Sequence, residues 1–130
     1  MTQLLCHLWG DYILQSHWMA TKKTTQSGAA AAHAIAYTVP FIFLTHSHWA
    51  LMIIAVSHFF IDRYRLARYA VWFKNWIRPQ GELSAWADCS TTGFVMEKCG
   101  GPAMWLQVWL LIIVDNTIHL TINYLALRFA

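Results

Sequence analysis

Charged side chains are scarce in this sequence. Asp, Glu, Lys and Arg make up 12% of its 130 residues, about half their share in an ordinary soluble domain, while hydrophobic residues make up 58%. A chain with so few charges cannot cover itself with polar surface. A lipid-facing exterior removes that difficulty, because the outside of a bundle in a bilayer is as apolar as its core. The composition therefore predicts an integral membrane protein, and the length predicts a single domain over residues 1–130.

The sequence also lacks the marks of several other protein classes. Its three cysteines, Cys6, Cys89 and Cys99, form no CxxC pair and no zinc-ribbon spacing. A net charge of +3 is too small to indicate nucleic acid binding. We expect no cleavable signal peptide, because Gly10 and Asp11 interrupt the apolar N-terminal segment. The expected partner is therefore a lipid bilayer and not a nucleic acid.

Hydrophobic periodicity predicts an all-α membrane bundle of about four helices. The predicted helices are residues 2–22, 29–45, 48–76 and 103–128. Pro40 is expected to kink the second helix. The segment from Ile77 to Pro102 is rich in Gly, Ser, Thr and Pro, which predicts a loop between the third and fourth helices.

Basic residues gather beside two of these predicted connections. Lys22 and Lys23 end the first helix, and Arg63 and Arg65 follow the apolar run 49–61. Cytoplasmic ends of membrane helices carry such clusters. The loop between the third and fourth helices is therefore predicted to be cytoplasmic.

Three of the predicted helices each carry a His and an Asp four residues apart. The pairs are His7 with Asp11, His58 with Asp62, and Asp115 with His119. Spacing of four places both side chains on one face of a helix. Random placement would give about 0.4 such pairs by a simple template count. His33, on the second helix, can enter the same layer.

The free-energy cost of placing aspartates inside a membrane suggests a chemical role for these pairs. An Asp near the centre of a membrane helix costs about 2.5–3.5 kcal/mol, and several ionised carboxylates repel one another. A divalent cation, protonation, or Arg63 and Arg65 could compensate. Imidazole and carboxylate together suit Zn, with Mn or Fe as further choices. Two other readings remain open: a structural hydrogen-bond network, and a relay for protons or ions.

Four segments resemble an uncharacterised family of small bacterial and phage membrane proteins that share a domain of unknown function. The segments are HLWGDYILQ (7–15), AAHAIAY around His33, HFFIDRYR (58–65) and VDNTIHL (114–120). The family's corresponding elements are His-Leu-x-x-Asp-Phe-x-x-Gln, a lone His, His-Phe-x-x-Asp-x-x-Lys and Asp-Gln-x-x-His. Arg65 and Asn116 depart from this pattern. The resemblance implies the bacterial inner membrane, and the chain is also loosely similar to membrane-bound metal-dependent hydrolases.

These observations give two functional hypotheses from different classes. The first is a membrane metalloprotein with the chemistry of a metal-dependent hydrolase, whose Asp11, Asp62 or Asp115 acts as general base. Its metal ligands would be His7, Asp11, His33, His58, Asp62, Asp115 and His119. Arg65 would hold an anionic group of the substrate. The second is a non-enzymatic phage or bacterial module that binds a host membrane complex or forms a homo-oligomer, with a purely structural cluster.

Overall fold

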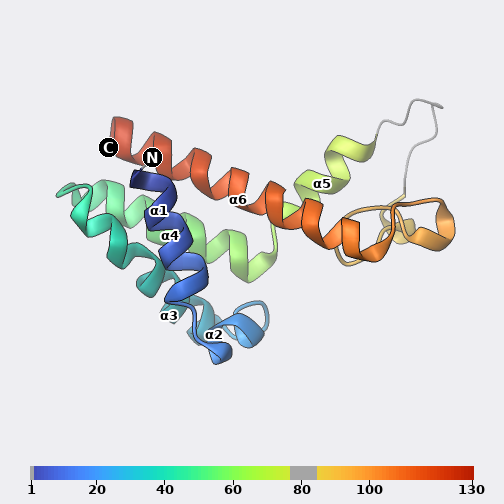
Figure 1. The fold of residues 1–130 in the computed structure, drawn as a ribbon, viewed down its shortest axis with the longest axis horizontal. Helices are drawn as coiled ribbons and strands as arrows, with labels where there is room; N and C mark the ends of the chain where they lie inside the picture. Colours follow the sequence, from blue (N-terminus) through green and yellow to red (C-terminus); the bar gives the residue numbers. More distant parts are fainter. Residues whose placement is uncertain (1, 77–84) are drawn as a thin grey trace. The chain divides into compact units, whose positions relative to one another are not determined.

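The computed structural model describes residues 2–76 and 85–130, and these residues are helical with no strand (Figure 1). An isolated bridge between Cys89 and Val95 is their sole β-type pairing. The all-α prediction is confirmed. The chain divides into two compact units, one formed by Met1–Arg65 with Ile118–Ala130 and the other by Leu66–Thr117.

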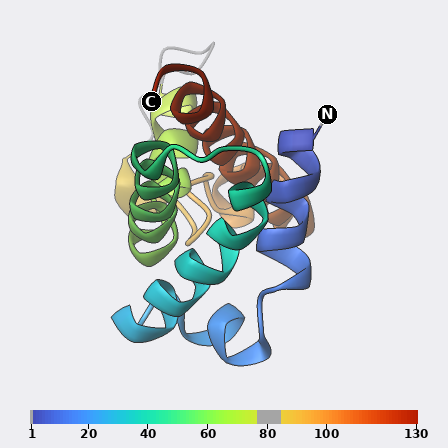
Figure 2. The same ribbon diagram turned by 90° about the vertical axis from the view of Figure 1, so that its left-hand side faces the viewer.

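Within the described residues, the first unit contains four α-helices and the end of a fifth. Helix α3 (Ser27–Thr38) packs against α4 (His48–Tyr64), against α2 (His17–Lys22) and against the π-helical turn η1 (Trp9–Ile13) that follows α1 (Thr2–Leu8). Figure 2 shows α3 running between α1 and α4. Residues 118–130, the end of α6 (Met104–Phe129), complete the unit.

Small residues permit this close packing of α3. Ala29, Ala30 and Ala34 on α3 and Ala50 on α4 are all at most 3% exposed. A methyl side chain lets two helix backbones approach closely. A hydrophobic core cluster continues from these alanines and consists of Tyr37, Phe41, Ile54 and Ala126.

The helix predicted over 2–22 is divided into three parts. Helix α1 passes into η1 at Trp9, the backbone leaves the helix near Gln15, and Ser16 caps α2 by accepting a hydrogen bond from the Met19 amide. Gly10 allows the π-helical turn to lie against α3, because a Cβ there would be 2.7 Å from the Tyr37 carbonyl oxygen. Such π-turns often occur at functional sites, and this one turns Asp11 inward.

Two other predicted helices are also interrupted. The second ends in a 3-10 segment, η2 (Val39–Phe43), which has Pro40 in its first turn, where the helix lacks a backbone donor. The third is broken at Arg65, whose left-handed backbone (φ 53) ends α4 before α5 (Ala67–Trp76) begins. The fourth predicted helix agrees with α6 to within a residue at each end.

The second unit contains α5, the 3-10 turns η3 (Trp86–Asp88) and η4 (Glu97–Cys99), and the first part of α6. Gln107 organises it. Its side-chain oxygen accepts hydrogen bonds from Ser90 and Thr92, and its nitrogen donates to the carbonyls of Val95 and Pro102. Residues 77–84 of the predicted loop lie outside the described residues, and the remainder is an ordered connection.

Membrane-spanning capacity is narrower than predicted. Within residues 2–76 and 85–130, α6 is the one helix both long and apolar enough to cross a bilayer, and Ser27–Phe43 is a shorter apolar segment. Large apolar side chains are exposed on other helices too, including Ile35, Phe43 and Trp49. A bundle of four membrane helices therefore stays a prediction.

Candidate metal centre

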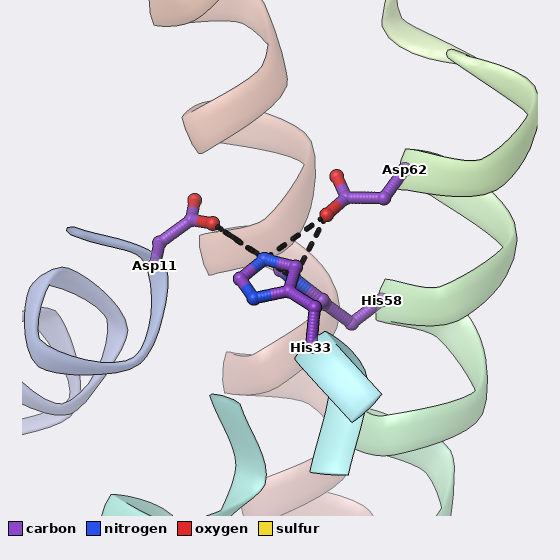
Figure 3. Close-up of side chains that lie close together, drawn as sticks. All are labelled: Asp11, His33, His58 and Asp62. Atoms are coloured by element: carbon purple, nitrogen blue, oxygen red, sulfur yellow. Dashed lines mark hydrogen bonds and ion pairs between the residues drawn. The ribbon is translucent and has the colours of Figure 1, made fainter. Parts of the chain in front are cut away.

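Four polar side chains from three segments meet inside the first unit (Figure 3). Asp11 comes from η1, His33 from α3, and His58 with Asp62 from one face of α4. All four residues are buried, with exposed fractions between 0% and 7%. The spacing of four residues on α4 gives the predicted result, because it points both side chains the same way.

The donor atoms of this Asp/His cluster converge on a small volume. The Nε2 atom of His33 lies 3.1 Å from Asp11 Oδ1 and 3.2 Å from Asp62 Oδ2. The Nε2 atom of His58 lies 3.1 Å from Asp62 Oδ2 and 3.9 Å from Asp11 Oδ1. The two Nε2 atoms are 3.0 Å apart. All four donor atoms lie within 4.8 Å of one another.

These separations match a metal coordination sphere. Tetrahedral zinc with bonds of about 2.0–2.1 Å to nitrogen and oxygen places its ligand atoms about 3.3–3.4 Å apart. Hydrogen bonds alone do not account for the contacts, because one Nε2 atom carries at most one hydrogen. His33 Nε2 faces Asp11, Asp62 and His58, and Gln15 Nε2 is also 3.0 Å away. The Asp/His cluster can therefore hold a metal ion.

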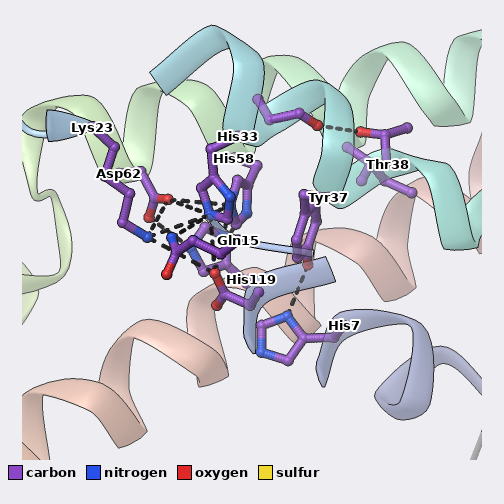
Figure 4. Close-up of polar contacts among 12 residues, drawn as sticks. His7, Gln15, Lys23, His33, Tyr37, Thr38, His58, Asp62 and His119 are labelled. Carbon is purple, nitrogen blue, oxygen red and sulfur yellow. Dashed lines mark hydrogen bonds and ion pairs between the residues drawn. The ribbon is translucent and has the colours of Figure 1, made fainter. Parts of the chain in front are cut away.

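Lys23 supplies the positive charge nearest to the carboxylates. Its Nζ atom lies 2.8 Å from Asp62 Oδ2, 3.4 Å from His33 Nε2 and 3.9 Å from Asp11 Oδ1 (Figure 4). Sequence reasoning missed this contact and placed Lys23 only in a cytoplasmic basic cluster. Helix periodicity does not indicate the contact, because the turn between α2 and α3 is what places Lys23 beside the carboxylates.

His119 lies at the edge of the Asp/His cluster. Its Nε2 atom is 3.5 Å from Asp62 Oδ1, and its Nδ1 atom is 3.2 Å from His58 Nδ1. Asp115 lies one turn earlier on α6, is partly buried and belongs to the second unit. Its predicted role as a ligand or base stays a prediction.

His7 is held away from the four donor atoms by a second polar layer. Asn123 Nδ2 donates to the Tyr37 hydroxyl over 2.6 Å, and that hydroxyl is hydrogen-bonded to His7 Nδ1 over 2.8 Å. The Tyr37 ring stacks on His58 with centroids 3.6 Å apart. His7 therefore supports the cluster through Tyr37, as outer partners of metal ligands commonly do.

Arg65 has a structural position that the sequence did not predict. Its backbone amide contacts the Asp62 carbonyl oxygen at 3.3 Å, and it forms the left-handed end of α4. Its predicted role as a holder of a substrate anion stays a prediction. Lys23 is the cation that the structure places against the carboxylates.

A family model described as a protein of unknown function (DUF3307) matches residues 1–82. These residues contain all four members of the Asp/His cluster together with Lys23. No curated protein and no solved structure matches the chain.

Proposed function

We propose that this chain, which belongs to the DUF3307 family, is an integral membrane protein that binds a divalent metal ion through its Asp/His cluster. The convergence of the four donor atoms carries the proposal. Two imidazoles and two carboxylates suit zinc, and manganese or iron(II) fit the same ligand types.

Hydrolysis is the reaction class that this donor set favours. A divalent cation bound there would supply Lewis acidity to a water and a substrate oxygen. The chain's own residues would accept a proton, hold the ligands in position and limit the access of bulk water. Asp11 or Asp62 can accept a proton through the carboxylate oxygen not used as a ligand. Tyr37 holds the His58 ring in place, and the burial of both histidines limits access by bulk water.

The membrane assignment rests on α6 and on the exposed apolar side chains. Helix α6 has 26 residues, about 39 Å at 1.5 Å per residue, which is enough to cross with some tilt. Ser27–Phe43 and α4 would complete a membrane bundle with it. The basic residues near Lys23 and Arg63 favour placing that end of the first unit on the cytoplasmic side of a bacterial inner membrane.

A structural role for the cluster is the second candidate, and Lys23 is the observation that favours it. Its ammonium already lies 2.8 Å from Asp62, so the metal-free cluster is partly neutralised. In that case the chain would be a non-enzymatic module that binds a membrane complex or a second copy of itself.

Metal analysis of detergent-purified protein separates these candidates. We expect about one equivalent of metal in the wild type after dialysis, near-complete loss in Asp62→Asn, and no change in His17→Gln, whose side chain is exposed. A folded wild type that binds no added zinc, manganese or iron(II) would overturn the metal proposal and leave the structural role. Variants that lose metal but keep biological activity would exclude catalysis at the cluster.

The membrane proposal has its own test. A fusion of the chain to a fluorescent protein should remain in the membrane fraction after carbonate extraction and leave it only with detergent. Release by carbonate alone would show peripheral attachment and contradict a spanning α6.

A further inference from the structure

His119 contacts two residues of the Asp/His cluster at the same time (Figure 4). Its Nδ1 atom lies 3.2 Å from the Nδ1 atom of His58, and its Nε2 atom lies 3.5 Å from Asp62 Oδ1. Both partners belong to α4, and their other atoms, His58 Nε2 and Asp62 Oδ2, are the ones that meet inside the cluster. The imidazole of His119, which is 1% exposed, therefore lies behind the donor atoms of two expected metal ligands.

The contact between the two imidazoles allows a single hydrogen. Two nitrogen atoms 3.2 Å apart form a hydrogen bond when one carries a hydrogen and the other offers a lone pair. A metal ion on His58 Nε2 uses the lone pair of that atom, so the hydrogen of the neutral ring must be on Nδ1. His58 then donates to His119, whose Nδ1 atom accepts. The hydrogen of His119 is consequently on Nε2, the atom that faces the Asp62 carboxylate.

A second metal ion is the rival role for His119. Asp62, Asp115 and His119 offer donor atoms that lie within 4.8 Å of one another. A metal on His119 Nε2 would move the hydrogen of that ring to Nδ1. There it would meet the Nδ1 hydrogen of the ligated His58 across the same 3.2 Å contact, which is repulsive. Ligation of one metal by His58 therefore disfavours ligation of a second by His119.

The charges around the cluster also favour one metal ion over two. The carboxylates of Asp11, Asp62 and Asp115 contribute three negative charges. The Lys23 ammonium, 2.8 Å from Asp62, contributes one positive charge. One divalent ion held by neutral histidines therefore neutralises this group, whereas a second would leave two uncompensated positive charges.

We infer that His119 is a positioning residue for the metal site and not a ligand, an inference that rests on the proposed function. With metal bound, His119 accepts a hydrogen bond from His58 Nδ1 and directs its own Nε2 hydrogen at Asp62 Oδ1. The first interaction holds the His58 ring with Nε2 toward the metal. The second engages Asp62 Oδ1 and leaves Oδ2 for the metal. Outer partners of this kind set the tautomer and orientation of metal-bound histidines.

His33 differs from His58 in this respect. Its Nδ1 atom is buried and has no hydrogen-bond partner among residues 2–76 and 85–130. A metal on His33 Nε2 would place a hydrogen on that atom as well. His58 is therefore the histidine ligand whose tautomer is set by a neighbouring side chain, and His119 is that neighbour.

The tautomer of His119 can be measured directly. Nitrogen NMR of protein whose histidine rings carry the heavy nitrogen isotope distinguishes a nitrogen with a hydrogen, a nitrogen with a lone pair and a nitrogen bound to zinc. In detergent-solubilised protein loaded with zinc, we expect the hydrogen of His119 on Nε2 and that of His58 on Nδ1. A zinc-bound Nε2 atom in His119, or a hydrogen on its Nδ1 atom, would overturn the inference.

Zinc affinity and ligand count then separate positioning from ligation. His119→Phe removes both contacts and should lower zinc affinity about 10–100-fold, as loss of an outer partner commonly does. It should still bind one equivalent at saturating zinc, and X-ray absorption should still show two imidazole ligands. His119→Gln keeps one acceptor and one donor, so we expect it to recover zinc affinity to within about fivefold of the wild type.

His17→Phe is the matched control, since the side chain of His17 is exposed. It should leave zinc affinity within about twofold of the wild type, as surface substitutions usually have small effects. Unchanged affinity in His119→Phe, or loss of one imidazole from its X-ray absorption, would overturn the inference. So would two equivalents of zinc in the wild type and one in His119→Phe. A wild type that binds no zinc would instead remove the metal proposal itself. If His119→Phe does not fold, the tautomer in the wild type decides.

Discussion

The imidazoles of His33 and His58 face each other across α3 and α4, with their Nε2 atoms 3.0 Å apart. Each of these atoms also faces the Asp62 carboxylate at 3.1–3.2 Å. The positions of the two rings follow from the close approach of α3 and α4, whose buried alanines place their backbones near each other. The donor geometry thus follows from the packing of α3 against α4.

The structure predicts that His33 and His58 are metal ligands and that His7 is not. We expect His33→Gln and His58→Gln each to lower zinc affinity at least about tenfold, because each removes a donor atom. His7→Gln should retain zinc within about tenfold, because His7 is outside the group of four donor atoms and its Nδ1 atom is hydrogen-bonded to the Tyr37 hydroxyl. Cobalt substitution, read by visible absorption and by metal content, measures all three. If His7→Gln lost as much bound cobalt as His33→Gln, His7 would have to be counted among the metal ligands.

Metal removal should lower stability without unfolding the protein. Saturating metal at about a thousand times its dissociation constant stabilises a folded state by about 4 kcal/mol. We therefore expect a chelator to lower the thermal midpoint by about 10–20 °C, and added zinc to restore it. Lys23 partly neutralises the metal-free carboxylates, so the protein should remain folded. A midpoint indifferent to both chelator and zinc would support the structural role of the cluster.

The helical class and the core of the site could be predicted from sequence because both depend on local spacing. His58 and Asp62 share a face of α4 as their four-residue separation requires. The lone His33 was likewise placed in the same layer, and it is fully buried there. The pair His7 and Asp11 obeyed the spacing only in part, because the π-helical turn at Trp9 changes the angular relation between the two side chains.

Features set by chain reversals could not be predicted. Lys23 reaches Asp62 because α2 packs back against α3. Sequence periodicity does not indicate this tertiary contact. Arg65 ends α4 in a left-handed conformation that a residue other than glycine rarely adopts, so the amphipathic pattern appeared to continue through it. The four membrane spans stay a prediction, because within residues 2–76 and 85–130 only α6 is both long and apolar enough to cross a bilayer.

The Tyr37 hydroxyl should matter for stability more than for metal binding. Tyr37→Phe removes a hydrogen-bond partner of both His7 and Asn123, which should cost about 1–3 kcal/mol of unfolding free energy. The phenyl ring still stacks on His58, so zinc affinity should change by less than about threefold. Thermal unfolding and zinc titration measure the two effects. Tyr124→Phe, at an exposed position, is the control and should alter neither. If Tyr37→Phe lowered zinc affinity well beyond threefold while the unfolding free energy stayed unchanged, Tyr37 would be part of the metal site.

Gly10 should be required for the position of Asp11, because its missing side chain lets η1 lie against α3. A Cβ at this residue would be 2.7 Å from both the Tyr37 carbonyl oxygen and its ring, so Gly10→Ala must push the turn away from the helix. We expect a loss of about 1–3 kcal/mol in unfolding free energy and weaker zinc binding. Gly28→Ala is the matched control, since a Cβ there meets nothing within 4 Å. The control should be neutral or stabilising by up to about 1 kcal/mol, as alanine favours helix. Equal behaviour of the two variants in thermal unfolding and zinc titration would contradict the close approach of η1 to Tyr37.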